Sequence, residues 1–136
     1  NQYIKIADSL SRQLDVSSRM TYEVNYQRAV LLMKESKFKE AFELFNEVKL
    51  FYKEKKSKQE YVHLLSEIGL ALIDLGNYEL GMSHYFEALP LAQMGGMQRE
   101  NAKLSWQIAE VHYILKQFRE AKAYCIGSLK LAESNN

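Results

Sequence analysis

The same residue types recur at intervals of 40 along this chain of 136 residues. One position in each interval is aromatic and two others are small. The aromatic set is Phe38, Tyr78 and Phe118, and the small sets are Ala41, Gly81 and Ala121, and Ala29, Gly69 and Ala109. A period of about 20–50 residues is typical of proteins built by stacking one supersecondary unit on the next. We therefore expect a stack of similar units in place of one globular core.

Apolar spacing predicts two helices in each unit. In the second unit, positions i, i+3, i+4 and i+7 of one helical face are held by Leu65, Ile68, Gly69 and Leu72. Gly76 and Asn77 then interrupt the pattern, because both residue types accept the left-handed backbone that ends a helix. A second helix follows, with one face formed by Tyr78, Gly81, Tyr85, Ala88 and Leu89.

The same pattern, followed along the whole chain, predicts seven helices. They cover residues 2–14, 19–34, 38–55, 59–75, 78–92, 98–115 and 118–133, with turns between units near 15–18, 56–58 and 95–96. Pro90 lies within the apolar pattern of the fifth helix, and proline lacks the N–H group that a helix interior requires. We expect a bend or an early end of that helix near Ala88–Leu89.

The composition favours an ordered domain and argues against two classes of partner. Apolar residues make up 47% of the chain and charged residues 26%, which is typical of folded soluble proteins. The formal net charge of +1 supplies no field that would attract nucleic acid or an anionic membrane surface. No apolar run approaches the ~18 residues of a membrane-spanning helix. The first residues show neither an initiator methionine nor a signal peptide, so we expect a piece of a longer protein, cytoplasmic or periplasmic according to its flanking segments.

The repeat resembles the tetratricopeptide repeat. The resemblance covers residues 19–133 and is carried best by the second unit, through Gly69, Leu72, Gly76-Asn77-Tyr78, Gly81, Tyr85 and Ala88. It implies a single all-α domain over residues 1–136: a right-handed superhelix, or α-solenoid, of three helix hairpins preceded by one helix of a partial unit. The expected units are about 19–58, 59–97 and 98–136, and the leading helix is 2–14.

The unit length adds a functional expectation to the resemblance. Units of 40 residues, against the usual length of about 34, are similar to the repeats of bacterial sensor kinases, transcription regulators and peptide receptors. The resemblance therefore implies a non-catalytic domain that binds a protein or peptide as the sensory or regulatory part of a signalling protein.

The inner face of the first helix in each pair is the candidate binding surface, because stacked hairpins curve into a superhelix lined by those helices. The candidate groove residues are Tyr26, Gln27, Val30, Met33, His63, Ser66, Glu67, Leu70, Ile73, Lys103, Trp106, Gln107, Glu110 and Tyr113. Their mixture of aromatic, aliphatic and polar groups suits an extended peptide or a partner helix, with Tyr26, Trp106 and Tyr113 as anchors. The alternative is that these side chains only pack the helices against one another.

No other cluster of residues predicts a catalytic, metal or cofactor site, and we expect no enzyme. His63, His84 and His112 are spaced too widely for two ligands on one helical face. Cys125 is the sole cysteine, so it allows no internal disulfide and is expected to be a small buried residue. The lysines of residues 53–58 are expected in a solvated turn. The carboxylate-binding clamp of some tetratricopeptide domains is also excluded, because Glu67 would repel a carboxylate and Lys103 alone matches the clamp.

Self-assembly is the alternative function. Repeat arrays usually need polar capping helices at their ends, yet the last helix carries Ala121, Tyr124, Cys125, Leu129 and Leu131. The chain is therefore a candidate for a dimerisation scaffold that associates through its uncapped end helices.

Overall fold

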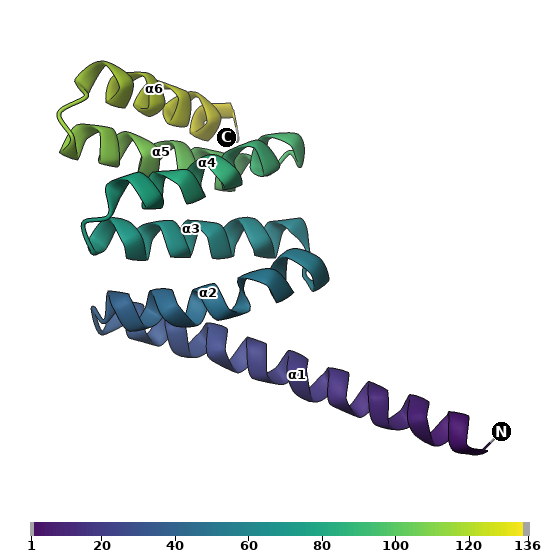
Figure 1. Ribbon diagram of the computed structural model, residues 1–136. Coiled ribbons are helices and arrows are strands. Elements are labelled where there is room, and N and C mark those ends of the chain that lie inside the picture. The colour runs from purple at the N-terminus through teal and green to yellow at the C-terminus, as the bar shows by residue number, and fades with distance from the viewer. Residues whose placement is uncertain (1, 135–136) are drawn as a thin grey trace.

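The computed structural model describes residues 2–134 and shows six helices and no strand within them. In chain order they are α1 (Gln2–Lys34), α2 (Phe38–Lys55), α3 (Lys58–Asp74), α4 (Tyr78–Met94), α5 (Gln98–Ile114) and α6 (Phe118–Ser134). Each helix packs on the next, and the three hairpins α1–α2, α3–α4 and α5–α6 stack in one direction (Figure 1). The expected all-α stack of helix hairpins is confirmed. None of the helices in this part of the chain is both long enough and apolar enough to cross a membrane.

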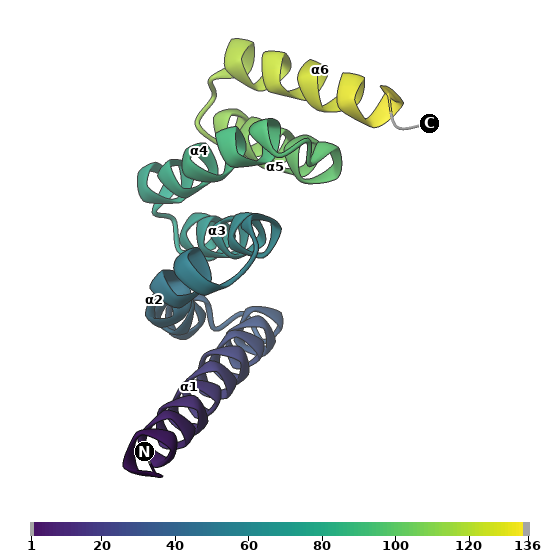
Figure 2. The ribbon, with the colours of Figure 1, turned by 90° about the vertical axis from the view of Figure 1, so that its right-hand side faces the viewer.

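α1 is one helix where two were expected. It runs unbroken for 33 residues, and its first half extends beyond the stacked hairpins (Figures 1 and 2). The expected turn at 15–18 is wrong, because this stretch contains neither glycine nor proline and its side chains support the helix. Arg19 Nε lies 3.5 Å from Asp15 Oδ2, and the Thr21 hydroxyl donates a hydrogen bond of 3.0 Å to the carbonyl of Ser17. The segment 2–14 is therefore the beginning of α1.

α4 continues past Pro90, so the expected early end near residue 89 is also wrong. The helix ends at Met94, one turn beyond the proline. Proline removes one backbone hydrogen bond, whereas Leu89 and Ala92 on either side of it are buried. Their burial holds the last turn in place, while Pro90 itself is exposed.

The turns inside the three hairpins share one geometry, although only one of them contains glycine. Ser36, Gly76 and Lys116 have positive φ angles of 61°, 85° and 61°. In each turn the following residue donates a backbone hydrogen bond to the carbonyl five positions back, as Asn77 does to Leu72 at 2.8 Å. Glycine favours this left-handed helix end, and other residues adopt it at a cost of about 1–2 kcal/mol.

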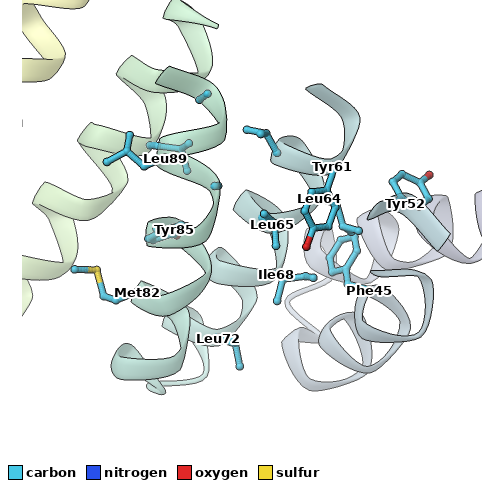
Figure 3. Close-up of a cluster of buried hydrophobic side chains, with 14 of the residues drawn as sticks. Phe45, Tyr52, Tyr61, Leu64, Leu65, Ile68, Leu72, Met82, Tyr85 and Leu89 are labelled. Atoms are coloured by element: carbon cyan, nitrogen blue, oxygen red, sulfur yellow. The ribbon is translucent and has the colours of Figure 1, made fainter. Parts of the chain in front are cut away.

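Small residues allow the two helices of the second hairpin to approach closely. A Cβ atom on Gly69 would lie 2.5 Å from Tyr85 Cε1, and one on Gly81 would lie 2.6 Å from Ile73 Cδ1. Tyr85 is 1% exposed, and Figure 3 shows it among the buried side chains that α2, α3 and α4 contribute to one core. The small residues that recur every 40 positions therefore mark a close contact between helices.

A polar cluster links α2, α3 and α4. Glu87 on α4 accepts a hydrogen bond from the Tyr61 hydroxyl of α3, and its Oε1 lies 3.4 Å from Lys49 Nζ of α2. Burial raises the pKa of the Glu87 carboxyl, but the hydrogen bond from Tyr61 and the charge of Lys49 outweigh this effect and hold the pKa below its usual value. The carboxylate therefore stays ionised and connects three helices.

Candidate functional site

An open hollow of about 940 Å³ lies across the first helices of the three hairpins. We call it the inner groove. Its walls come from the second half of α1, the end of α2 and the beginnings of α3 and α5. The lining residues are Met20, Glu23, Val24, Tyr26, Gln27, Arg28, Leu31, Tyr52, Lys56, Gln59, Glu60, His63 and Glu100.

A second hollow of about 610 Å³ lies between α5 and α6. We call it the end slot, because α5 and α6 form the last hairpin of the stack (Figure 1). The residues that line it are Trp106, Ala109, Glu110, Tyr113, Ile114, Phe118, Ala121, Lys122 and Cys125.

The candidate residues chosen from the sequence divide between these two hollows. Those that line the inner groove are Tyr26, Gln27 and His63. Those that line the end slot are Trp106, Glu110 and Tyr113. The three aromatic side chains expected as anchors are therefore not brought together in one hollow.

Several other candidates pack helices together, as the alternative interpretation holds. Ser66 and Gln107 are buried, and the Ser66 hydroxyl donates a hydrogen bond of 3.0 Å to Gln107 Oε1 across α3 and α5. The half-buried aliphatic candidates that pack against the core are Val30, Met33 and Ile73. Of the remaining three, Glu67 and Leu70 are half-buried and Lys103 is exposed.

Stacked aromatic rings form the floor of the inner groove. The Tyr26 and Tyr52 rings lie 5.1 Å apart between centroids at an interplanar angle of 20°, and Tyr26 also meets the edge of Phe45 at 5.7 Å. Burial raises the pKa of both tyrosines, and the negative charge of Glu67 raises that of Tyr26 further. Both phenols therefore stay neutral and keep their hydrogen-bond donors.

An ionic contact closes one side of this groove. Lys56 Nζ lies 2.5 Å from Glu23 Oε1 of α1 and 3.7 Å from Glu60 Oε2 of α3, and 5.7 Å from the centre of the Tyr52 ring. The hydrogen bond to Glu23 raises the pKa of the Lys56 ammonium group. Ser57 then caps α3 by accepting a hydrogen bond of 3.1 Å from the Glu60 backbone N–H. Lys56 therefore fixes the position of α1 against the start of α3.

Sequence reasoning missed most of the lining of the inner groove. Lys56 was expected in a solvated turn, yet its side chain is only 21% exposed. The Ser57–Glu60 spacing is a capping-box pattern and could have indicated that this turn is ordered. Met20 lies seven residues before Gln27 and Val24 lies three before it, so helical spacing alone could have placed both beside the groove.

The remaining candidates for chemistry do not converge. His84 Nδ1 lies 2.9 Å from the Leu80 carbonyl oxygen, and His112 Nδ1 lies 2.6 Å from Gln117 Oε1. His63 Nε2 lies 3.8 Å from Glu67 Oε1. Within residues 2–134, no three histidine, cysteine, aspartate or glutamate side chains are grouped so that they could hold a metal ion. Cys125 is half-buried and lines the end slot.

Comparison with solved structures identifies the architecture. The chain is similar to the TPR (tetratricopeptide-repeat) domain of FLU from Arabidopsis, with a TM-score of 0.76 and 13% sequence identity over 85% of this chain and 98% of that one. The chain has the tetratricopeptide-repeat fold. No family model matches the sequence, and no curated protein matches it either. At this level of identity the likeness concerns the fold, so the role of the tetratricopeptide hairpins has to be argued from the inner groove and the end slot.

Proposed function

We propose that this tetratricopeptide-repeat domain is non-catalytic and binds a protein segment or peptide in the inner groove, without a cofactor. The observation that carries the proposal is the inner groove, an open hollow of about 940 Å³. Sites for small ligands usually measure about 300–1,000 Å³, so this volume accommodates a few side chains of an extended segment. The 40-residue unit length supports a place in the sensory or regulatory part of a bacterial signal-transduction protein.

The lining of the inner groove suits such a ligand. Met20, Val24 and Leu31 offer exposed apolar side chains along α1, and methionine adapts its shape to different partners. Gln27 and His63 are exposed on the facing helices α1 and α3 and can donate or accept hydrogen bonds to a peptide backbone. Because Lys56 and the stacked tyrosines already hold the walls, little ordering remains to be done when a ligand binds.

Selection from a library of displayed short peptides tests this proposal. A selected peptide is titrated by fluorescence anisotropy against the parent chain and against a Gln27→Ala, His63→Ala double variant. We expect binding at least about tenfold weaker in the double variant, because both replaced groups lie on the groove and each lost hydrogen bond is worth about 1 kcal/mol. A Gln93→Ala variant, which removes an exposed amide from α4, should bind like the parent. Equal binding by the double variant, or failure of the library to give any binding peptide, would reject the groove.

Self-assembly is the second candidate function, and the end slot is the observation that favours it. Trp106, Tyr113 and Ile114 are 50%, 67% and 50% exposed there. Contiguous exposed apolar patches of this kind usually mark an interaction surface. The inner groove and the end slot share no lining residue, so the two proposed functions can be tested separately.

A further inference from the structure

The first half of α1 carries an apolar stripe that no other part of the described chain covers. Every residue from 2 to 21 is exposed. Ile6, Leu10 and Leu14 are 49%, 54% and 69% exposed, and their spacing of four residues places them on one face of the helix. We call this face the α1 stripe. A helix with an apolar face in water gains free energy when that face is covered.

The end slot lies at positions equivalent to those of a surface that already receives a helix elsewhere in the molecule. The positions 40 residues before Trp106, Lys122 and Cys125 are Ser66, Met82 and Tyr85. In that earlier unit α5 packs on α3 and α4, Ser66 is bonded to Gln107, and Met82 and Tyr85 are both buried. The end slot is the same surface of the next unit, with no described helix seated on it.

The α1 stripe also carries the sequence that fills the equivalent surface. Residues 10–14 are Leu-Ser-Arg-Gln-Leu, and residues 104–108 of α5 are Leu-Ser-Trp-Gln-Ile. In α5, Leu104 and Ile108 are 1% and 0% exposed and belong to the core shared with α3 and α4. Gln107 accepts the hydrogen bond from the Ser66 hydroxyl. The stripe therefore presents, in exposed form, the face with which α5 packs on the preceding hairpin.

We propose that the α1 stripe of one copy docks in the end slot of a second copy, as α5 does on α3 and α4. This inference deepens the self-assembly function and is independent of ligand binding in the inner groove. The docked segment, residues 2–18, is as long as α5, which has 17 residues, and so spans the slot. The docked helix would extend, beyond the last hairpin, the stacking interface that already joins the hairpins within the chain.

The charges and the size of the two surfaces agree with this docking. Glu110 and Lys122 border the end slot, and Arg12 and Asp15 flank the stripe. Each surface therefore offers one positive and one negative charge. Stable interfaces bury roughly 1,200–2,000 Å² in total, and one helix of about 25 Å in a groove falls near the lower limit. The contact joins different surfaces on the two copies, so it leaves a free stripe and a free slot for further copies.

A complementation experiment tests the proposal by analytical ultracentrifugation of the 136-residue chain. A stripe variant carries Leu10→Glu and Leu14→Glu, and a slot variant carries Trp106→Asp and Tyr113→Asp. All four positions are exposed, so both variants should fold. We expect the parent to associate as its concentration rises. Each variant alone should associate at least about 30-fold more weakly than the parent.

The mixture of the two variants gives the decisive result. The slot variant keeps an intact stripe and the stripe variant keeps an intact slot, so together they should form a one-to-one dimer and nothing larger. A Leu50→Glu variant, changed at an apolar residue that is 65% exposed on α2, should assemble like the parent. A mixture that stays monomeric while the parent associates would overturn the docking and leave a symmetric form of self-assembly. A parent that stays monomeric at every concentration would overturn both and show that something other than a second copy covers the slot.

A cross-linking measurement keeps the proposal testable should either double variant lose its helical circular dichroism. Cys125 is the sole cysteine and lines the end slot. In a Ser11→Cys variant, a short bis-maleimide should link position 11 of one copy to position 125 of another, and Cys125→Ser should abolish that link. Links only between two copies of position 11 would overturn the docking.

Discussion

Replacing Gly69 by alanine measures how tightly the second hairpin is packed. The added Cβ atom would lie 2.5 Å and 2.7 Å from two ring atoms of Tyr85, and 3.1 Å from the carbonyl oxygen of Gly81. Carbon atoms in contact normally lie about 3.5–4.0 Å apart, so the ring must move by about 1 Å. Tyr85 is 1% exposed, and neighbouring side chains restrict that movement.

Two opposing effects set the change in the free energy of unfolding that Gly69→Ala should cause. Overpacking of a filled core costs about 1–3 kcal/mol, and this contact, with backbone on one side and a buried ring on the other, belongs to the upper half of that range. Alanine gains about 1 kcal/mol over glycine in a helix interior. We expect Gly69→Ala to lower the free energy of unfolding by about 1–2 kcal/mol.

Gly127 provides the matched control for this substitution. It lies inside α6, and a Cβ atom placed on it meets nothing within 4 Å. Gly127→Ala should therefore raise the free energy of unfolding by about 0.5–1 kcal/mol through helix propensity alone. Urea unfolding followed by circular dichroism measures both changes. If Gly69→Ala proves as stable as the parent or more stable, the close approach of α3 and α4 is not the reason for glycine at this position.

Two further predictions concern the turns and the polar cluster of α2, α3 and α4. Lys116→Gly should stabilise the chain by about 1 kcal/mol, because lysine holds a positive φ there. Gly76→Ala should destabilise it by a similar amount. If the two variants melt at the same temperature, the assignment of strain to these turns is wrong. The pKa of Glu87 is held below 4.5 in the folded chain, so its ionised form adds stability above that pH, and this stability is lost as the pH falls through the folded pKa. Glu87→Gln should therefore flatten the loss of melting temperature in acid relative to the parent, and an unchanged acid profile would show that its contacts with Tyr61 and Lys49 do not stabilise the fold.

The fold could be predicted from the sequence because its signals are local and repeated. The stretch around Gly76 and Asn77 marks the end of one helix, and the 40-residue period transfers that boundary to the turns at Ser36 and Lys116, which contain no glycine. The same transfer failed at residues 15–18. A period predicts a break there, but nothing in the local sequence ends the helix, and residues 4–18 are exposed, so tertiary packing does not impose a turn on them.

The site was harder to predict because the surroundings of a repeat position depend on its place in the stack. Helical phase alone identifies which residues leave the hairpin on the inner side, and three of these, Tyr26, Gln27 and His63, line one hollow. It cannot distinguish a position that the next hairpin covers from one that stays open. Glu100 comes from the third unit and Lys56 from the turn between α2 and α3, so both are brought to the groove only by the packing of the helices.

The pair Ser66 and Trp106 shows what this dependence means for function. The two residues occupy equivalent positions, yet Ser66 is buried against Gln107, whereas Trp106 is half exposed and its indole N–H donates to Glu110 on its own helix. Ser66 is small and contacts α5, whereas Trp106 offers a large apolar ring to a partner on the equivalent surface. The surface that builds the stack in one unit is exposed in the next, and the docking proposed above would use there the packing chemistry that folds the chain.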